Sequence, residues 1–213
     1  MPTLETLAAF FGVSLVLGLS PGPDNIFVLL QSARHGWRAG LCVVLGLCLG
    51  IVGHTAAVAL GLAALLAASA LAFTVLKLCG AAYLAWLAWG ALRAPAVAVA
   101  PPAAGAAGAQ SGGTLRMVGR GVLMNLSNPK VLIFFLAFLP QFADPARASV
   151  APQIMLLGLV FILATLLVFG SIALFSGTFG VLLLRSARAQ RLLNRTAAVV
   201  FLGLAAKLAT AQR

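Results

Sequence analysis

Charged side chains are scarce in this chain of 213 residues. Only 8% of its residues are charged and 62% are hydrophobic, whereas about 25% are charged in a typical soluble domain. This shortage excludes a water-soluble globular protein and predicts an integral membrane protein. The apolar residues form long runs separated by short polar stretches, a pattern typical of membrane helices rather than of the alternating strands of a barrel.

Acidic side chains are the rarest of all. The chain contains only Glu5, Asp24 and Asp144, and they lie far apart in the sequence. The magnesium site of a lipid-modifying enzyme needs clustered carboxylates, so we expect a protein that is not an enzyme and needs no cofactor. Two histidines and three cysteines are also too few for a convincing metal site, which disfavours a metal-cation exporter without removing that alternative.

The cysteines give no disulfide framework, because Cys42, Cys48 and Cys79 all lie in apolar segments. A membrane protein that conveys electrons between thiols would need one cysteine in each of two pseudo-symmetric spans. Here the second half of the chain has none. We therefore keep a transmembrane thiol-electron conveyor only as an unfavoured alternative.

Six apolar segments are long enough to cross a bilayer, which takes about 20 residues. They cover residues 7–32, 40–66, 70–92, 117–142, 153–180 and 193–211. The sequence thus predicts an all-α, multi-pass protein with six transmembrane helices. The lipid bilayer is its first partner.

The net charge of +11 is distributed in a way that indicates membrane orientation rather than nucleic-acid binding. Cytoplasmic loops of membrane proteins are enriched in basic residues. The even loops contain only Arg147. The odd loops contain Arg34, Arg38, Arg93, Arg116, Arg120, Arg185, Arg188, Arg191 and Arg195. We expect the odd loops to be cytoplasmic and both termini to be periplasmic, in the inner membrane of a bacterium.

Residues 94–115 have a different composition from the rest of the chain. Most of them are Ala, Pro, Gly and Ser without charge, and such a segment cannot bury enough surface to fold. We read a flexible cytoplasmic linker between two three-helix repeats, residues 1–93 and 116–213. An odd number of spans in each half makes the halves opposite in topology, as in inverted-repeat transporters.

Two polar segments interrupt helices at corresponding places in the halves. The first span contains SPGPDN at residues 20–25, and the fourth contains NLSNPK at residues 125–130. Paired interruptions of this kind are the best sequence pointer to a transporter's binding site, because a broken helix is tolerated only within protein or beside a water-filled cavity. We assign the helix-break hinges to Ser20, Pro21, Gly22, Pro23, Asn125 and Pro129.

The polar side chains in these breaks are the candidates for binding substrate or protons: Asp24, Asn25, Asn128 and Lys130. Asp24 is the only acidic residue within a span, which makes it a functional candidate by default. It has three candidate partners: a substrate ammonium, a proton or Lys130 itself. Asn128 followed by Pro129 is typical of a helix N-cap, and Ser20 or Asp24 could serve in the same way in the first span. A lysine in a first helical turn opposes the helix dipole, which favours an anionic partner for Lys130.

Two further polar residues lie inside spans. His54 follows Gly46 and Gly50 at spacings of four, and this small-residue stripe favours close helix packing. It therefore indicates that His54 faces protein, within the chain or in a homodimer, as a packed residue or as a proton carrier. Lys77 in the third span is a binding candidate or a lysine that extends to the membrane surface. Trp86 and its aromatic neighbours look like an interface belt.

The two break motifs, together with GWRAG (36–40), LKLCGAAYLAWLAWGALR (76–93) and NLSNPKVLIFFLAFLPQF (125–142), resemble the LysE/RhtB family of bacterial amino-acid exporters. The resemblance covers nearly the whole chain, apart from the Ala/Pro linker. It implies six spans in the inner membrane and export of amino acids driven by the proton gradient. It also matches Asp24 to the acidic residue after the first-span prolines, and Asn128, Pro129 and Lys130 to the fourth-span motif.

The predicted function is therefore secondary active export of amino acids by proton antiport. A substrate with two positive charges would need more than the one carboxylate that lies inside a span. We therefore favour small neutral amino acids such as threonine or homoserine. A basic amino-acid exporter is the alternative that the sequence leaves open.

Overall fold

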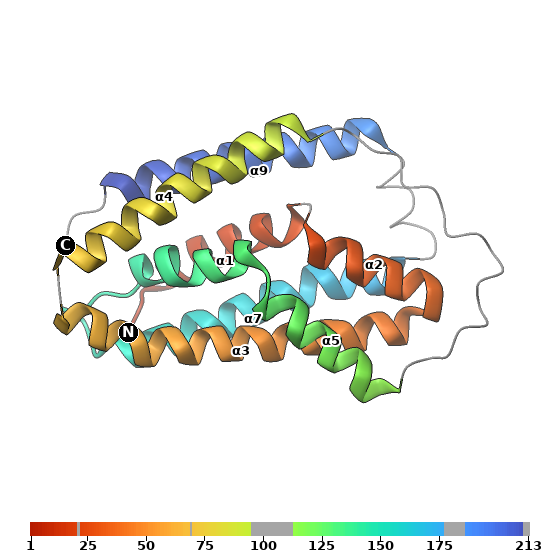
Figure 1. Cartoon of the computed structure of the whole chain (residues 1–213), viewed down its shortest axis with the longest axis horizontal. Helices are drawn as coiled ribbons and strands as arrows, with labels where there is room; N and C mark the ends of the chain where they lie inside the picture. Colours follow the sequence, from red (N-terminus) through yellow and green to blue (C-terminus); the bar gives the residue numbers. More distant parts are fainter. Residues whose placement is uncertain (21, 69, 95–112, 177–185, 211–213) are drawn as a thin grey trace.

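Every regular element in the described part of the chain is a helix, which confirms the predicted all-α class (Figure 1). The computed structural model describes residues 1–20, 22–68, 70–94, 113–176 and 186–210. The predicted linker therefore lies almost wholly outside the described residues. The elements are α1 (Leu4–Leu19), α2 (Pro23–His35), α3 (Trp37–Ala68), α4 (Ala70–Arg93), α5 (Thr114–Leu126), α6 (Pro129–Ile133), the π-helix η1 (Phe134–Phe138), the 3-10 helix η2 (Leu139–Phe142), α7 (Val150–Phe175) and α9 (Ala187–Thr210).

Three helices are long and apolar enough to cross a membrane on their own: α3 over Trp37–Gly61, α7 over Val150–Phe175 and α9 over Gln190–Thr210. Two bent helix pairs, α1 with α2 and α5 with the segment up to Phe142, raise the number to five if each pair is one span. The expected span at residues 70–92 coincides with α4, in which the side chains of residues 70–73 lie outside the described part. Length and composition thus give three to five candidate spans, and six stays a prediction.

The first break lies where the sequence predicted it, between α1 and α2, whose axes differ by 63°. α1 ends at Leu19, and α2 begins at Pro23. Proline suits the first position of a helix because its missing N–H would have no partner there. The predicted polar N-cap, Ser20 or Asp24, is wrong: Gly22 occupies that position and makes no side-chain cap. Pro21, also assigned to the hinge, lies outside the described residues.

The second break separates α5 from α6 and bends the chain by 54°. Asn128 is the N-cap of α6, because its side-chain oxygen accepts a hydrogen bond from the backbone N–H of Lys130 at 3.0 Å. Pro129 occupies the first helical position. The capping pair that the sequence predicted here is confirmed, since both of its signals act locally.

An aromatic core anchors the chain after the second break. Phe134, Phe135 and Phe138 in η1 are fully buried. The ring of Phe134 packs against Phe10 of α1 at a centroid distance of 5.9 Å, and that of Phe135 against Phe161 of α7 at 5.1 Å, while Phe138 packs against Phe134 at 5.1 Å. A π-helical turn is rare and often marks a functional segment. This core fixes η1 against both helices, and so positions the break that precedes it.

The helices form two layers (Figure 1). α4 and α9 pack side by side in one layer, while α3 packs against both α5 and α7 in the other, with α1 also on α7. The layers meet where η1 contacts α4 and where α1 contacts α9. Both breaks therefore lie between the layers rather than on the outer face of the molecule.

The glycine stripe of α3 packs directly on the backbone of α5. A Cβ atom built on Gly46 would lie 2.8 Å from the Cα of Gly121, and one built on Gly50 would lie 2.6 Å from the side-chain oxygen of Asn125. Only glycine allows this approach. The close packing predicted from the stripe is confirmed, and its partner is a helix of the same chain.

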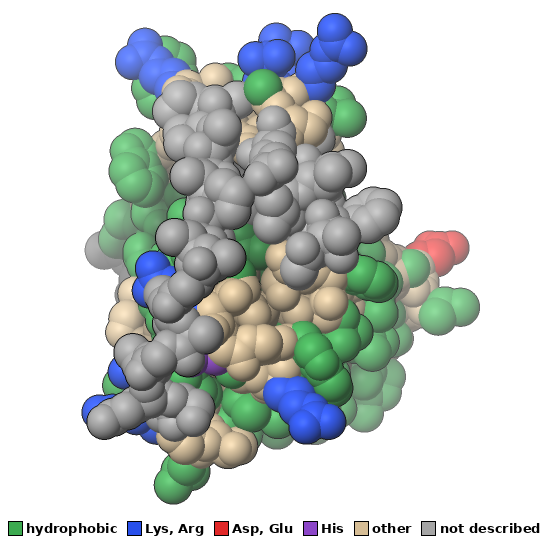
Figure 2. All heavy atoms as spheres, turned by 90° about the vertical axis from the view of Figure 1, so that its right-hand side faces the viewer, with side chains coloured by type: hydrophobic (Ala, Val, Ile, Leu, Met, Phe, Trp, Pro, Cys, Tyr) green, Lys and Arg blue, Asp and Glu red, His purple; other side chains and the backbone are tan. Residues whose placement is uncertain are grey.

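Most of the described arginines lie at one end of the molecule. α2 and α4 end there, and α3, α5 and α9 begin there, at the right of Figure 1, whereas α1 begins and α9 ends at the opposite end. Figure 2 faces the first end and shows Lys and Arg side chains around its edge. Arg34 lies in the last turn of α2, and Arg93 lies in the last turn of α4. The odd-loop arginines that the structure describes thus share one end.

Candidate functional site

A hydrogen bond between side chains joins the two breaks. Asp24 lies in the first turn of α2 with only 4% of its surface exposed. Its Oδ2 accepts a hydrogen bond from Nδ2 of Asn128 at 2.8 Å. The other side-chain atom of Asn128, Oδ1, caps α6. One amide thus fixes the start of α6 and holds the carboxylate of the opposite half of the chain.

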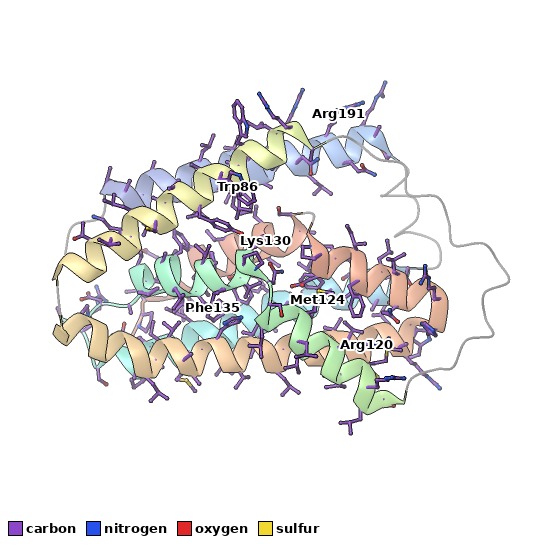
Figure 3. The ribbon with its side chains drawn as sticks, in the orientation of Figure 1. Trp86, Arg120, Met124, Lys130, Phe135 and Arg191 are labelled. Atoms are coloured by element: carbon purple, nitrogen blue, oxygen red, sulfur yellow. The ribbon has the colours of Figure 1, made fainter. Side chains whose placement is uncertain are left out.

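Lys130 reaches from the second break to the first. Its Nζ donates hydrogen bonds to the backbone carbonyls of Leu17 and Ser20, each at 3.0 Å. These carbonyls belong to the end of α1, where the helix dipole favours a cation. Figure 3 shows Lys130 at this junction, between α6 and α1. The partner of Lys130 is therefore a helix terminus. Lys130 was one of the three partners considered for Asp24, but among the described residues the two side chains form no direct ion pair.

Two small residues of the first break complete this contact. Asn25 donates from Nδ2 to the carbonyl of Gly18 at 2.7 Å, which ties the start of α2 to the end of α1. A Cβ atom on Gly22 would lie 3.1 Å from the ammonium of Lys130, so the glycine leaves room for that side chain. Asn25 and Gly22 therefore support the break, and neither contacts the carboxylate of Asp24 in a described hydrogen bond.

His54 of α3 contacts the end of α5, at the second break. Its Nε2 lies 3.3 Å from the backbone carbonyl of Asn125 at the end of α5, and a carbonyl can only accept, so Nε2 carries the hydrogen. The ring lies 5.7 Å from that of Phe135. His54 is buried, as the glycine stripe indicated, and it contacts a carbonyl that also accepts a hydrogen bond from the backbone N–H of Asn128 at 3.0 Å.

A small cavity of about 20 Å³ lies between Asp24, Asn125 and Lys130, closed by apolar residues of α1, α3 and α7. The Oδ1 atoms of Asp24 and Asn125 are both buried without a hydrogen-bond partner in the protein. A cavity needs about 10–15 Å³ to hold one water molecule. In this conformation the site by Asp24 accommodates a proton or a water, and it is too small for an amino acid.

A larger cavity of about 180 Å³ lies on the other side of Lys130, between α4, α9 and the first break. Trp86 and Asn194 line it, and sequence reasoning missed both. Trp86 was read as part of an interface belt, and Asn194 is a single polar residue near the start of the last span. Only their position next to Lys130 links them to the site.

Other candidates lie apart from this junction. Lys77 is half-buried on α4 and is not among the described residues that line either cavity. Cys42, Cys48 and Cys79 are free thiols. In the described residues, no three His, Cys, Asp or Glu side chains gather in a group that could hold a metal ion.

Comparison with known proteins identifies the family. Residues 15–212 match the model of the LysE type translocator family. The chain is 33% identical over 210 residues to a homoserine/homoserine lactone efflux protein of Salmonella typhimurium, covering 99% of this chain and 98% of that one. It is 33% identical over 210 residues to an uncharacterized membrane protein of Vibrio cholerae, covering 96% of each.

A leucine efflux protein of Enterobacter is 29% identical over 205 residues, covering 96% of this chain and 92% of the other. No solved structure matches the chain. The family match extends over both breaks and every residue described above at their junction. This protein belongs to the LysE family of translocators.

Proposed function

We propose that this protein exports amino acids across the bacterial inner membrane in exchange for protons. The observation that carries the proposal is the buried junction of the two breaks, where Asp24 is held by Asn128 and Lys130 is held by the end of α1. A carboxylate and an ammonium lie there without a direct ion pair, beside a cavity. Ionisable groups in such a position are expensive in a membrane and mark a transport pathway.

Asp24 is the proton site of the mechanism. Asp24 lines the small cavity, and its buried Oδ1 has no hydrogen-bond partner, so this oxygen can accept a proton. When the breaks open, the same carboxylate can hold the ammonium of an amino acid. Because one carboxylate binds either a proton or an ammonium, inward proton flow becomes coupled to outward substrate flow.

Lys130 is the group that meets the substrate carboxylate. In this structure its ammonium donates hydrogen bonds to two carbonyls at the end of α1. A charged carboxylate is a stronger acceptor than a neutral carbonyl. Arrival of the substrate would therefore draw Lys130 away from α1 and release the first break. That exchange links binding to a change in the angle between α1 and α2.

The helix contacts support two inverted repeats. In such repeats α1 corresponds to α5, α3 to α7, and α4 to α9. The contact of α1 with α7 then corresponds to that of α5 with α3, and the pairs α3–α7 and α4–α9 correspond to themselves. At each break a side chain of the other half contacts the end of the preceding helix: Lys130 contacts the end of α1, and His54, from α3, contacts the end of α5. Six spans related in this way, with midplane breaks, suit alternating access.

The relatives favour neutral substrates. Two of those named above are efflux proteins for homoserine and its lactone and for leucine, and neither homoserine nor leucine has a positively charged side chain. Asp24 is the only carboxylate at the junction, which leaves no second partner for a cationic side chain. We therefore propose small and medium neutral amino acids as the substrates.

Replacing Asp24 tests this function. Asp24→Asn keeps the size of the side chain and its hydrogen bond to an amide, but it cannot be charged. We expect normal amounts of protein in the membrane and loss of net efflux of labelled leucine and homoserine from loaded cells. The same variant should lose the response of efflux to an imposed proton gradient.

Glu5→Gln is the matched control, because Glu5 is exposed in the first turn of α1 and lies far along that helix from the break. It should export at the wild-type rate. Export by Asp24→Asn at the wild-type rate and with unchanged pH dependence would show that Asp24 carries neither the proton nor the amine. Export of none of the tested amino acids by the wild type would contradict the proposed function itself.

A further inference from the structure

We propose, on the basis of the function just proposed, that the larger cavity beside Lys130 holds the side chain of the exported amino acid and selects neutral side chains. This cavity lies between α4, α9 and the first break, with a volume of about 180 Å³. Figure 3 shows Trp86 on the side of α4 that faces Lys130. The cavity is separate from the small one at Asp24, and Lys130 lines both.

The wall of the cavity is mostly apolar, and Ser20, Lys130 and Asn194 are its polar members. Trp86, Leu87 and Phe201 supply the apolar part. Asn194 also lines it, is 6% exposed, and has an Oδ1 that is buried without a hydrogen-bond partner. Buried polar atoms are nearly always paired, and ligand sites are typically apolar with a few placed polar groups. An unpaired acceptor in an apolar wall is suited to a substrate hydroxyl.

Lys130 fixes how an amino acid would lie. With the substrate carboxylate on the ammonium of Lys130, the α-carbon is at the boundary between the two cavities. The amine then points to the side of Asp24, and the side chain extends into the larger cavity. The small cavity, at about 20 Å³, could not accept that side chain in the reverse orientation.

The charges around the larger cavity exclude basic side chains. No acidic residue lines it, and the other two carboxylates of the chain, Glu5 and Asp144, line a cavity beside the first turn of α1. A lysine or arginine side chain would bring a second buried cation next to Lys130 without a partner, which is strongly unfavourable. Discrimination thus comes from repulsion as well as from fit.

The volume indicates the size of side chain that this cavity can hold. An apolar cavity of about 150 Å³ accepts a benzene molecule, so about 180 Å³ has room for the side chain of leucine, threonine or homoserine. The substrate class is therefore neutral amino acids with aliphatic or hydroxyl side chains up to about this size. Glycine and alanine would leave much of the cavity unfilled.

Gly90 allows this cavity to be filled by mutation. Gly90 lines it, and a Cβ atom there would meet nothing within 4 Å. In loaded cells, Gly90→Val should reduce leucine efflux about tenfold relative to alanine efflux, because each added methyl group takes space from the larger side chain. Gly90→Ala should shift the ratio in the same direction by less.

Gly203→Val is the matched control, since Gly203 also has open space for a Cβ atom but lies outside the cavity. It should keep the wild-type ratio. An unchanged leucine-to-alanine ratio in both Gly90 variants, with wild-type export intact, would overturn the assignment of this cavity and leave the proposed function standing. Loss of all efflux in Asp24→Asn, measured in parallel, tests that function separately.

Asn194 provides a second, independent test. Asn194→Leu keeps the size of the side chain and removes the acceptor. One hydrogen bond contributes about 0.5–1.5 kcal/mol, so homoserine efflux should fall about two- to tenfold relative to leucine efflux. Equal effects on homoserine and leucine, or efficient lysine efflux by the wild type, would contradict the proposed selectivity.

Discussion

Lys130 and His54 have the same structural role at opposite breaks. Each contacts a backbone carbonyl beside a break: Lys130 at the end of α1 and His54 at the end of α5. An unsatisfied carbonyl in the hydrocarbon region costs several kcal/mol, and Lys130 supplies a partner to two of them. The carbonyl of Asn125 also accepts a hydrogen bond from the backbone N–H of Asn128 at 3.0 Å, so His54 adds to a bond already present. Both side chains come from the other half of the chain, so docking of the halves supports each break. This is why a positive side chain can lie in a first helical turn at Lys130.

Removing the charge of Lys130 distinguishes its contact with substrate from its contact with α1. Homoserine has a free carboxylate and homoserine lactone has none. A hydrogen bond to a charged group contributes about 1.5–3 kcal/mol, so Lys130→Gln should lower homoserine efflux about ten- to a hundredfold and lactone efflux much less. The measurement is efflux of both labelled compounds from cells with matched protein levels.

Lys207→Gln serves as the control for loss of a positive charge. Lys207 lies in the last turn of α9, over the ring of Phe142, and lines neither cavity at the junction. It should export both compounds normally. If Lys130→Gln reduces homoserine and lactone efflux equally, Lys130 acts only by holding the end of α1.

Some residues of the site could be predicted from sequence and others could not. Asn128 and Pro129 were predicted correctly because a cap and the proline after it are local signals. The partners of Lys130 were not, because they are backbone carbonyls 110 and 113 residues away in sequence. Trp86 lies in a family motif that says nothing of its role, and Asn194 lies in none of the quoted motifs. The packing of α4 on α9 brings both of them to Lys130.

At the scale of the helices, the contact of α3 with α5 holds the second break in place. Glycines on both helices bring the backbones together. Just beyond these glycines, the backbone carbonyl of Asn125 accepts a hydrogen bond from His54. Close approach of this kind gives van der Waals contact that lipid cannot replace. The second break therefore follows a closely packed segment of α5.

Two neighbouring glycines of α5 test this packing. A Cβ atom on Gly121 would lie 2.9 Å from the Cα of Gly46, whereas one on Gly119 would meet nothing within 4 Å. Gly121→Val should lower stability by about 3 kcal/mol, because backbone cannot move aside as a side chain can. Thermal unfolding of the purified protein in detergent measures the difference, and Gly119→Val should unfold at the wild-type temperature. Equal melting temperatures for the two variants would contradict the helix contact.

The helix breaks were predictable because proline inside a helix removes a backbone hydrogen bond and clashes with the preceding turn, whereas it is tolerated in the first turn. The glycine stripe of α3 predicted that a helix would approach closely, but not which helix, since small residues accept any partner of the right shape. The structure assigns that partner to α5 in the same chain, which removes the need for a second chain to explain the stripe. Whether the protein forms a homodimer is thus independent of this motif.

For the molecule as a whole, the distribution of charge predicts its orientation in the membrane. The arginine-rich ends of α2, α4, α5 and α9 lie together, and the beginning of α1 and the end of α9 lie at the opposite end (Figure 1). Basic residues are retained on the cytoplasmic side. We therefore expect the basic end to face the cytoplasm, and both ends of the chain to lie in the periplasm.

Reporter fusions test this orientation and the number of spans together. Alkaline phosphatase is active only in the periplasm, and green fluorescent protein fluoresces when it folds in the cytoplasm. A reporter placed between residues 94 and 113 should fluoresce and lack phosphatase activity, while fusions after Thr210 should show the reverse, because an even number of crossings returns the chain to the side on which it began. Phosphatase activity at the central position would reverse the orientation. Fluorescence at both positions would mean that the second half crosses the membrane an even number of times, which is incompatible with two inverted three-helix repeats.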